Sequence, residues 1–215
     1  MKRNIAVIGC GHWGKNHVRN FAELDALAAV CDPDKELSKH FAKLYSVKNL
    51  SFDEILMDQD IKGIVLATPA PLHASMSIKA MDRGKSVFVE KPISMNEDDA
   101  KEMINASKRN NVDLMVGHLL QYHPIFISLL SMCDSGELGE LKYIYSNRLS
   151  LGKIRSNEDV VWSFAPHDIS MILALAKCEP DKVATHRSSS IQKNINDIAK
   201  IHIDFPSGLK SHVSV

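Results

Sequence analysis

The sequence predicts an α/β protein in which a doubly wound parallel sheet precedes a smaller α+β domain with an open-faced sheet. Three observations support this. Short apolar runs alternate with helical patterns through the first half. A glycine-rich turn directly follows the first run. After about residue 117 this alternation ends, and alternating apolar residues indicate strands with one covered face. We therefore expect two domains, residues 1–121 and 122–215.

The first domain contains five apolar runs with the length of buried parallel strands. They are residues 5–8, 26–31, 63–67, 86–89 and 112–116. Helices are expected between them, at residues 12–24, 34–44, 71–83 and 97–109. In the first of these, Gly14, Val18 and Phe21 fall on one face, as in a helix packed on a sheet.

The second domain is expected to be mixed. Its predicted helices are residues 124–133 and 166–176, and its predicted strands are 141–149, 182–192, 197–205 and a return strand within 208–215. Ile201, Ile203 and Phe205 alternate as in a sheet with one covered face. Because nothing follows the return strand, we expect an incomplete domain with an unpaired edge after Val215.

Composition excludes several classes of protein. The 26 Lys+Arg balance 26 Asp+Glu, so no overall field favours nucleic acid or acidic membranes. No apolar run is long enough to span a bilayer, and the N-terminus lacks a signal-peptide core. Cys10, Cys31, Cys133 and Cys178 show neither metal-ligand nor disulfide spacing. We expect a cytoplasmic protein with reduced thiols and no metal.

The sequence GCGHWG at residues 9–14 follows the first strand and opens a helix, which is the context of a dinucleotide-binding turn. Gly9 permits the tight turn, Gly11 lets the backbone approach a pyrophosphate, and Gly14 allows close helix packing. Asp32 ends the second strand, where a carboxylate binds ribose hydroxyls and repels a 2′-phosphate. The pattern predicts NAD as cofactor, although such turns also occur without one.

Other candidate cofactor contacts lie in this turn and near the ends of the next two strands. They are His12, Trp13, Thr68, Pro69, His73 and Glu90. Cys10 and Trp13 are expected to pack at the turn, not to act as redox or stacking groups.

Lys91 stands in a Glu-Lys-Pro tripeptide that ends the strand at 86–89, at the sheet edge where doubly wound folds bind ligands. Together with the glycine turn, Asp32 and the Ala-Thr-Pro at 67–69, this tripeptide resembles the glucose-fructose oxidoreductase, inositol dehydrogenase and rhizopine catabolism family (Gfo/Idh/MocA). The resemblance implies that Lys91 is a catalytic residue near substrate and nicotinamide. Taken alone, Lys91 would be a solvated surface charge.

The family usually carries Asp-x-Gly-x-His-x-x-Asp in its second domain. The matching stretch here keeps His167 but has Ser163 and Ser170 where acids are common, which argues against an Asp-His relay. A proline precedes His167, and the start of a helix disfavours imidazolium, so a neutral ring could accept a hydroxyl proton. Lys91 would then stabilise the developing alkoxide. Alternatively, His167 packs at the helix start, and Asp168 is expected to be a first-turn helix acid.

Four segments, at residues 117–124, 146–149, 152–155 and 162–168, resemble the nucleotide-sugar branch of this family. That resemblance implies oxidation of the C3 hydroxyl of UDP-N-acetylglucosamine or its uronate, in bacterial surface-polysaccharide synthesis, by a homo-oligomer formed through the second-domain sheet. Candidate substrate contacts are Lys91, Tyr122, Asn147, Arg148, Lys153, Arg155, Trp162 and His167. The three cations of the second domain suit a diphosphate or a carboxylate, or else form a solvated basic loop.

Two alternatives remain open from the sequence. One is a dehydrogenase of the same family that acts on a free sugar, an inositol or an imine. The other is a noncatalytic NAD-binding remnant, because family members are longer than this chain.

Overall fold

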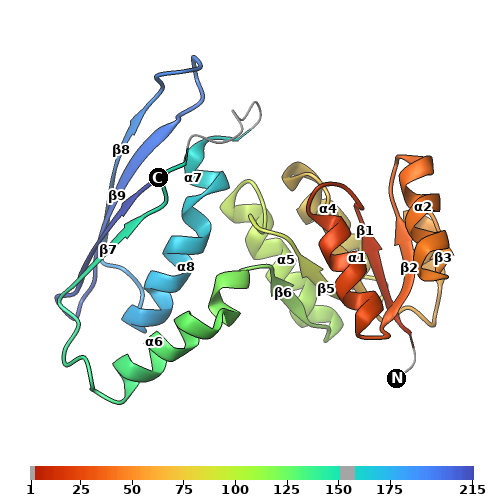
Figure 1. Ribbon diagram of the computed structural model, residues 1–215, viewed down its shortest axis with the longest axis horizontal. Coiled ribbons are helices and arrows are strands. Elements are labelled where there is room, and N and C mark those ends of the chain that lie inside the picture. Colours follow the sequence, from red (N-terminus) through yellow and green to blue (C-terminus); the bar gives the residue numbers. More distant parts are fainter. Residues whose placement is uncertain (1–2, 151–157) are drawn as a thin grey trace. The chain divides into compact units, whose positions relative to one another are not determined.

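A computed structural model describes residues 3–150 and 158–215 of the chain (Figure 1). The chain divides into two compact units, Met1–Gly117 and His118–Val215. The boundary expected after Gln121 therefore falls inside the second unit, in the 3-10 helix η2 (Leu119–Tyr122), which packs on helices of that unit. Lys153 and Arg155 lie outside the described residues.

The first unit contains a six-stranded parallel sheet in the order β3-β2-β1-β4-β5-β6. Its strands are β1 (Ile5–Ile8), β2 (Leu27–Cys31), β3 (Lys48–Asn49), β4 (Gly63–Leu66), β5 (Ser86–Val89) and β6 (Leu114–Val116). The five expected strands are present, and β3 is an additional short edge strand. The order reverses direction between β1 and β4, which is where doubly wound sheets bind ligands.

The helices of this unit are α1 (Gly14–Glu23), α2 (Lys35–Tyr45), α3 (Phe52–Met57), η1 (Ala70–Leu72), α4 (His73–Met81) and α5 (Glu97–Asn110). Side-chain caps stabilise the N-termini of several of these helices. The Asp34 carboxylate caps α2, and Ser51 and Glu54 form a capping box on α3. The expected helix at 71–83 starts two residues later because residues 70–72 form η1.

Apolar clusters cover both faces of the sheet. On one face Val7, Val18 and Val30 are fully buried, and on the other Ile64 and Leu66 pack in the cluster that includes residues of α4 and α5. Because successive residues of a strand point to opposite faces, a run with no polar residue is the pattern expected of a strand covered on both sides.

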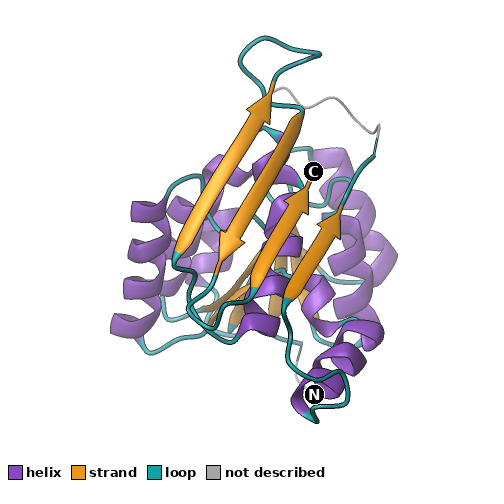
Figure 2. Ribbon diagram, turned by 90° about the vertical axis from the view of Figure 1, so that its left-hand side faces the viewer, coloured by secondary structure: helices purple, strands orange, loops and turns teal. Residues whose placement is uncertain are grey.

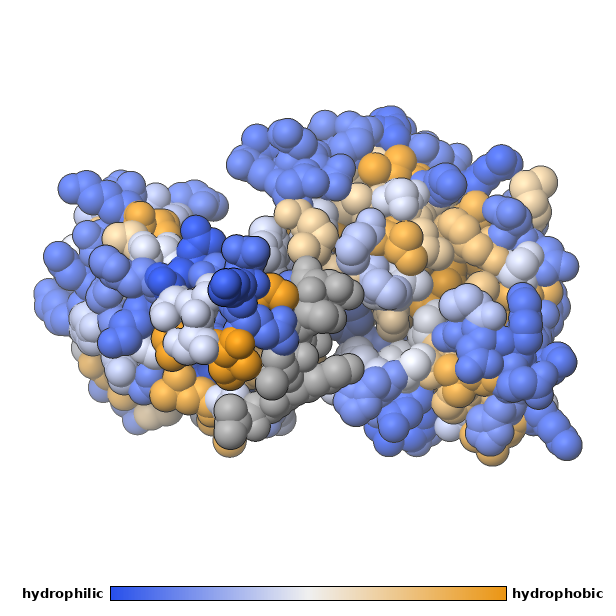
Figure 3. Space-filling view, turned by 90° about the horizontal axis from the view of Figure 1, so that it is seen from above, coloured by the Kyte–Doolittle hydropathy of each residue, from blue (hydrophilic) through white to orange (hydrophobic). Residues whose placement is uncertain are grey.

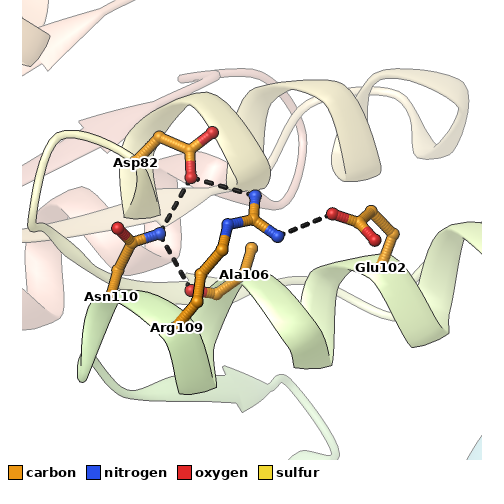
Figure 4. A network of polar contacts seen from close by, with 5 residues as sticks. All are labelled: Asp82, Glu102, Ala106, Arg109 and Asn110. Carbon is orange, nitrogen blue, oxygen red and sulfur yellow. Dashed lines mark hydrogen bonds and ion pairs between the residues drawn. The ribbon is translucent and has the colours of Figure 1, made fainter.

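A polar network joins the end of α4 to α5 (Figure 4). The Arg109 guanidinium binds Glu102 Oε1 at 2.6 Å and Asp82 Oδ1 at 3.0 Å. The Asn110 amide donates to the same Asp82 oxygen at 2.8 Å and to Ala106 O at 3.0 Å. Hydrogen bonds from Asn110 and Arg109 lower the pKa of Asp82, although burial opposes them. This network fixes the C-terminal end of α4.

The second unit contains a four-stranded mixed sheet in the order β7-β10-β9-β8. Its strands are β7 (Tyr143–Asn147), β8 (Lys182–Ser188), β9 (Ile198–Asp204) and β10 (Lys210–Ser214), and its helices are α6 (Pro124–Asp134), α7 (Val160–Ser163) and α8 (Ala165–Ala176). β10 pairs antiparallel with β9 and parallel with β7. The expectation of an unpaired edge after Val215 was wrong, because β10 lies inside the sheet and β7 and β8 form its edges among the described residues.

Helix α8 covers one face of this sheet. Ala165 and Ile172 pack against Ile201, Ile203 and Val213, all at most 3% exposed. Figure 2 looks onto the opposite face, where no helix of the described chain lies in front of the strands. Hydrophilic residues cover most of the surface seen in Figure 3, and hydrophobic residues are scattered among them. No helix within residues 3–150 and 158–215 has the length and apolar character needed to cross a membrane.

Candidate functional site: a dinucleotide turn and the strand ends around it

Two glycines of the turn after β1 are required by close backbone contacts. A Cβ on Gly14 would lie 1.8 Å from Gly9 O, and Gly9 itself has φ +87° and would place a Cβ 2.6 Å from Ala67 O. Gly11 differs, because a Cβ there meets nothing within 4 Å. The turn is thus tightly packed against the protein at Gly9 and Gly14, whereas the space beside Gly11 is empty. A pyrophosphate needs such a space to approach the backbone.

Asp32 stands immediately after β2 and is 9% exposed. Its Oδ2 accepts the Cys10 N–H at 2.6 Å, and its Oδ1 accepts the Asp34 N–H at 2.9 Å. A carboxylate oxygen can accept more than one hydrogen bond, so both oxygens keep capacity for ribose hydroxyls. The Cys10 donor therefore ties the carboxylate to the glycine turn, and the two donors together set its orientation.

Cys10 and Trp13 behave differently at this turn. Cys10 is 1% exposed and packs in the core, as expected, and burial, with the nearby Asp32 charge and Cys31, raises the pKa of its thiol to about 12. A thiol in this state is unreactive at neutral pH. The expectation that Trp13 packs was wrong, because the residue is 44% exposed and its Nε1 donates to Glu90 Oε1 at 2.7 Å.

The Glu90 carboxylate connects α1 to the end of β5. Its Oε1 lies 2.7 Å from both Trp13 Nε1 and His17 Nε2, and its Oε2 accepts the Lys91 N–H at 3.2 Å. Burial acts to raise the pKa of Glu90, but the bonds from His17, Trp13 and Lys91 outweigh it and lower the pKa. Gly117 passes close by, since a Cβ there would lie 3.0 Å from Oε1. Glu90 is therefore a fixed anion at the base of the site.

His73 joins the segments that follow β4 and β5. The ring is 1% exposed, with Nδ1 2.7 Å from Pro92 O and Nε2 2.9 Å from Thr68 O. Thr68 has a buried hydroxyl with no hydrogen-bond partner among the described residues. A buried hydroxyl without a partner is unusual and is explained if a bound ligand supplies one. Pro69 follows Thr68 and caps η1.

Lys91 follows β5 directly and is half-buried. The peptide that joins it to Pro92 is cis. The structure thus collects Gly11, Asp32, Thr68 and Lys91 at the carboxyl ends of β1, β2, β4 and β5, along one edge of one sheet. His12 also lies in the glycine turn and is exposed.

In the second unit, His167 lies in the first turn of α8, beside a proline at the helix start. The His118 ring is 6.2 Å from it, centroid to centroid, in an edge-to-face arrangement. From the sequence, His118 is expected either to line the substrate cleft or to be a satisfied structural histidine, and it belongs to the segment at 117–124 that carries the family resemblance. The two imidazoles therefore lie close together near the start of this helix.

Arg148 forms an ion pair with Asp168, at 2.5 Å from Nε to Oδ2. Asp168 also accepts a hydrogen bond from Ser146 Oγ at 2.6 Å and is 2% exposed. Asp168 does lie in the first turn of α8, as expected, but its main contact is this pair with the partly exposed Arg148, which the sequence did not reveal. The Arg148 charge is compensated within the unit, and its role in substrate binding stays a prediction.

The other expected substrate contacts are dispersed over the second unit. Tyr122 in η2 is 62% exposed, Trp162 in α7 is 37% exposed, and Asn147 ends β7. Lys91 belongs to the first unit and His167 to the second, so their action as a catalytic pair also stays a prediction. The described residues contain no group of three or more His, Cys, Asp or Glu that could hold a metal ion.

The topology of the first unit, its glycine turn and the Asp32 carboxylate define a Rossmann dinucleotide-binding protein. The chain belongs to the Gfo/Idh/MocA group, described as "Oxidoreductase family, NAD-binding Rossmann fold", which matches residues 3–118. The cofactor is accordingly NAD, as the Asp32 carboxylate predicts.

Relatives of the chain include oxidoreductases with different substrates. It is 29% identical over 176 residues to UDP-N-acetylglucosamine 3-dehydrogenase of Acidithiobacillus ferrooxidans, covering 81% of this chain and 54% of that protein. It is 26% identical over 223 residues to scyllo-inositol 2-dehydrogenase (NAD(+)) of Bacillus subtilis, covering 97% of this chain and 65% of that one. The chain thus spans less than two thirds of either relative.

Solved structures agree with this membership. UDP-N-acetylglucosamine 3-dehydrogenase from Acidithiobacillus ferrooxidans superposes with a TM-score of 0.88 at 25% identity, covering 98% of this chain and 68% of that one. The family and the two-unit fold are therefore established, while the relatives do not agree on one substrate.

Proposed function

We propose that the protein catalyses NAD-dependent oxidation of a secondary hydroxyl on a sugar, and that its substrate is the C3 hydroxyl of a UDP-N-acetylhexosamine or the corresponding uronate. One observation carries the proposal. Lys91 stands at the same sheet edge as the open glycine turn and the oriented Asp32, so the first unit holds both a cofactor site and a cation beside it. The relative named UDP-N-acetylglucosamine 3-dehydrogenase supports this choice of substrate.

Bound NAD supplies the acceptor for the hydride that leaves the carbon bearing the hydroxyl. The chain itself must orient the sugar and manage the hydroxyl proton. Lys91 donates a hydrogen bond to the hydroxyl oxygen and stabilises the negative charge that develops there. His167 accepts the hydroxyl proton, and its place in the first turn of α8 favours the neutral ring that this step needs. The products are the 3-keto sugar, NADH and one proton.

A second candidate is oxidation of an inositol by the same residues. The observation that favours it is the similarity to scyllo-inositol 2-dehydrogenase, which extends over 97% of this chain. Both candidates use the same cofactor and the same proton transfer, and they differ in whether a diphosphate must be bound. A noncatalytic NAD-binding role is the third possibility that the test must separate.

The test is a single-turnover reaction with stoichiometric NAD, followed by NADH absorbance. UDP-N-acetylglucosamine, its uronate and scyllo-inositol are offered separately. We expect NADH with one of the two UDP-sugars, and NADH with the inositol alone would favour the second candidate. NAD binding without NADH from any of them would support the noncatalytic role.

Two substitutions tie the reaction to the named residues. Lys91→Met and His167→Asn should each lower the rate by about 1000-fold or more, because each removes a group that acts on the hydroxyl. Affinity for NAD should change less than about threefold, a difference under 1 kcal/mol. Lys79→Met, which changes an exposed lysine of α4, is the matched control. Undiminished turnover by Lys91→Met would contradict the assignment.

We also propose that copies of the chain associate through the sheet face seen in Figure 2, and that the protein works in the cytoplasm on precursors of surface polysaccharide. The sheet face presents Tyr143 and Tyr145, 57% and 59% exposed, on the edge strand β7. Sedimentation equilibrium checks the association, and Tyr145→Glu should shift it toward the monomer.

A further inference from the structure

His73 binds the two segments that follow neighbouring strands of the first sheet. One ring nitrogen faces the carbonyl of Thr68, after β4, and the other faces the carbonyl of Pro92, after β5, at 2.9 Å and 2.7 Å. Pro92 is the residue directly after Lys91. The ring therefore spans from the Thr68 segment to the backbone that carries the candidate catalytic lysine.

The chemistry of these contacts restricts what the ring can do. A carbonyl oxygen only accepts hydrogen bonds, so each contact is a hydrogen bond only when that ring nitrogen carries a proton. The neutral ring has one N–H and the imidazolium ion has two. The ring is 1% exposed, and both of its polar atoms are engaged by backbone. His73 was expected from the sequence to contact the cofactor, but both of its ring nitrogens face backbone carbonyls instead.

The element that carries the ring is itself fixed. His73 is the first residue of α4, whose Ala80 and Met81 are fully buried. The far end of this helix is held by the network around Asp82 (Figure 4). A donor on such an element holds its acceptors in place, which a donor on a loose loop would not do.

We infer that His73 is a positioning residue that sets the place of Lys91 through the Pro92 carbonyl, and the place of the Thr68 segment through its other nitrogen. The inference rests on the proposed function, since it gives Lys91 a catalytic role. Glu90 holds Lys91 from its other side, by accepting the Lys91 N–H at 3.2 Å. The backbone of Lys91 is thus held on both sides. The His73 ring contacts the carbonyl of the next residue, Pro92, and the Glu90 carboxylate accepts the Lys91 N–H.

Three substitutions separate the two contacts. His73→Phe keeps a ring but has no donor, His73→Asn places an amide nitrogen near the position of Nδ1, and His73→Gln places one near the position of Nε2. We expect His73→Phe to lower kcat by about 10- to 100-fold, as small displacements of a catalytic group do, with KM nearly unchanged. His73→Asn should recover most of the loss and His73→Gln little of it, because only the Nδ1 contact reaches Pro92.

Affinity for NAD gives a readout that needs no turnover. Calorimetry should show weaker NAD binding by His73→Phe, and recovery by His73→Gln in preference to His73→Asn, because Thr68 is bound through Nε2. His40→Asn, at an exposed histidine of α2, is the matched control and should change neither quantity. Melting temperatures of all variants are measured together, since a merely structural role predicts that kcat follows stability and not the identity of the replaced nitrogen.

Nitrogen-15 NMR of the ring tests the contact directly. We expect a proton on Nδ1 that exchanges slowly with water, because Nδ1 must donate to Pro92. An unprotonated Nδ1 would overturn the inference. So would equal kcat for the Phe, Asn and Gln variants at equal stability. If Lys91→Met keeps full turnover, the proposed function fails, whereas loss in Lys91→Met with normal kcat in all three His73 variants overturns only the inference about His73.

Discussion

The candidate groups of the first unit come from turns that directly follow parallel strands, whereas those of the second come from a helix start and scattered surface positions. In the first unit the key interactions use the backbone, as at Gly11, or a carboxylate oriented by backbone donors, as at Asp32. In the second unit they depend on pairs of side chains, such as Arg148 with Asp168. Backbone geometry at strand ends is set by the fold, so it serves a cofactor shared by a whole family. Side-chain pairs can change without altering the fold, which suits recognition of different substrates.

The largest effect should come from the glycine turn. Gly14→Val must displace the backbone at Gly9, 1.8 Å from the new Cβ, and should abolish measurable NAD binding and cost about 3 kcal/mol of stability. Gly11→Ala meets nothing within 4 Å, so it should leave the melting temperature unchanged while it weakens NAD binding. Thermal melts and calorimetry of both variants check this. Equal destabilisation by the two would show that the turn is not divided into a packed and an open side.

Breaking the ion pair of the second unit should come next. Asp168→Ala leaves the Arg148 guanidinium, which is 32% exposed, without its buried partner and should cost about 2 kcal/mol in the free energy of unfolding. Asp134→Ala, which removes an exposed pair with Lys177, should cost less than about 1 kcal/mol. Chemical denaturation measures both. If Asp168→Ala lowered the free energy of unfolding no more than Asp134→Ala does, the Arg148–Asp168 pair would not stabilise the second unit.

Glu90 should make the stability of the first unit depend on acid pH. Its pKa is lowered in the folded state from an ordinary value of 4.5, so its contribution is present above pH 4.5 and is lost as the pH falls through the lower folded value. Glu90→Gln should therefore be less stable than wild type by about 1 kcal/mol at pH 7, and the difference should shrink below pH 4.5. Melting temperatures between pH 3 and 7 test this, and a constant difference would contradict it.

The smallest effect concerns the open sheet face of the second unit. Partial burial, with His202 and Lys200 nearby, lowers the pKa of His212 below its ordinary value of 6.5. The unfolded chain then binds the proton more readily, so this residue reduces stability as the pH falls below about 6.5. His212→Asn should flatten the fall in melting temperature between pH 7.5 and 5.5, by roughly 1 °C. If the melting temperature of His212→Asn fell as steeply with pH as that of wild type, protonation of His212 would not affect stability.

The features that could be predicted from the sequence are local. The five longer strands of the first unit appear as apolar runs, and the glycine turn and Asp32 are adjacent to strands that locate them. Strand β3, with two residues, and helix α3, with six, were missed because such short segments show too little hydrophobic periodicity. The capping box of Ser51 and Glu54 was the one sequence signal for α3. The predicted strand at 182–192 ends at Ser188, and the N–H groups of Ser190 and Ile191 bond the Asp197 carboxylate instead of a neighbouring strand.

The features that could not be predicted are contacts between distant residues. Trp13 and Glu90 are 77 residues apart, and Arg148 and Asp168 are 20 apart, so neither pair leaves a periodic signal. Trp13 was expected to pack at the glycine turn, and Arg148 was expected among the cations that bind a diphosphate or a carboxylate. His73 was expected to contact the cofactor, and its contacts with Thr68 and Pro92 became apparent only when the strand ends were brought together.

The measurement that tests the central claim most directly is calorimetric titration of NAD and NADP into the wild-type chain and into Asp32→Ala. The claim is that the glycine turn and the carboxylate it orients form an NAD site. We expect wild type to bind NAD at least about 10-fold more tightly than NADP, and Asp32→Ala to lose most of that preference, a change of about 1.4 kcal/mol. Equal binding of both cofactors by wild type, or NAD affinity unaffected by Asp32→Ala, would contradict the account.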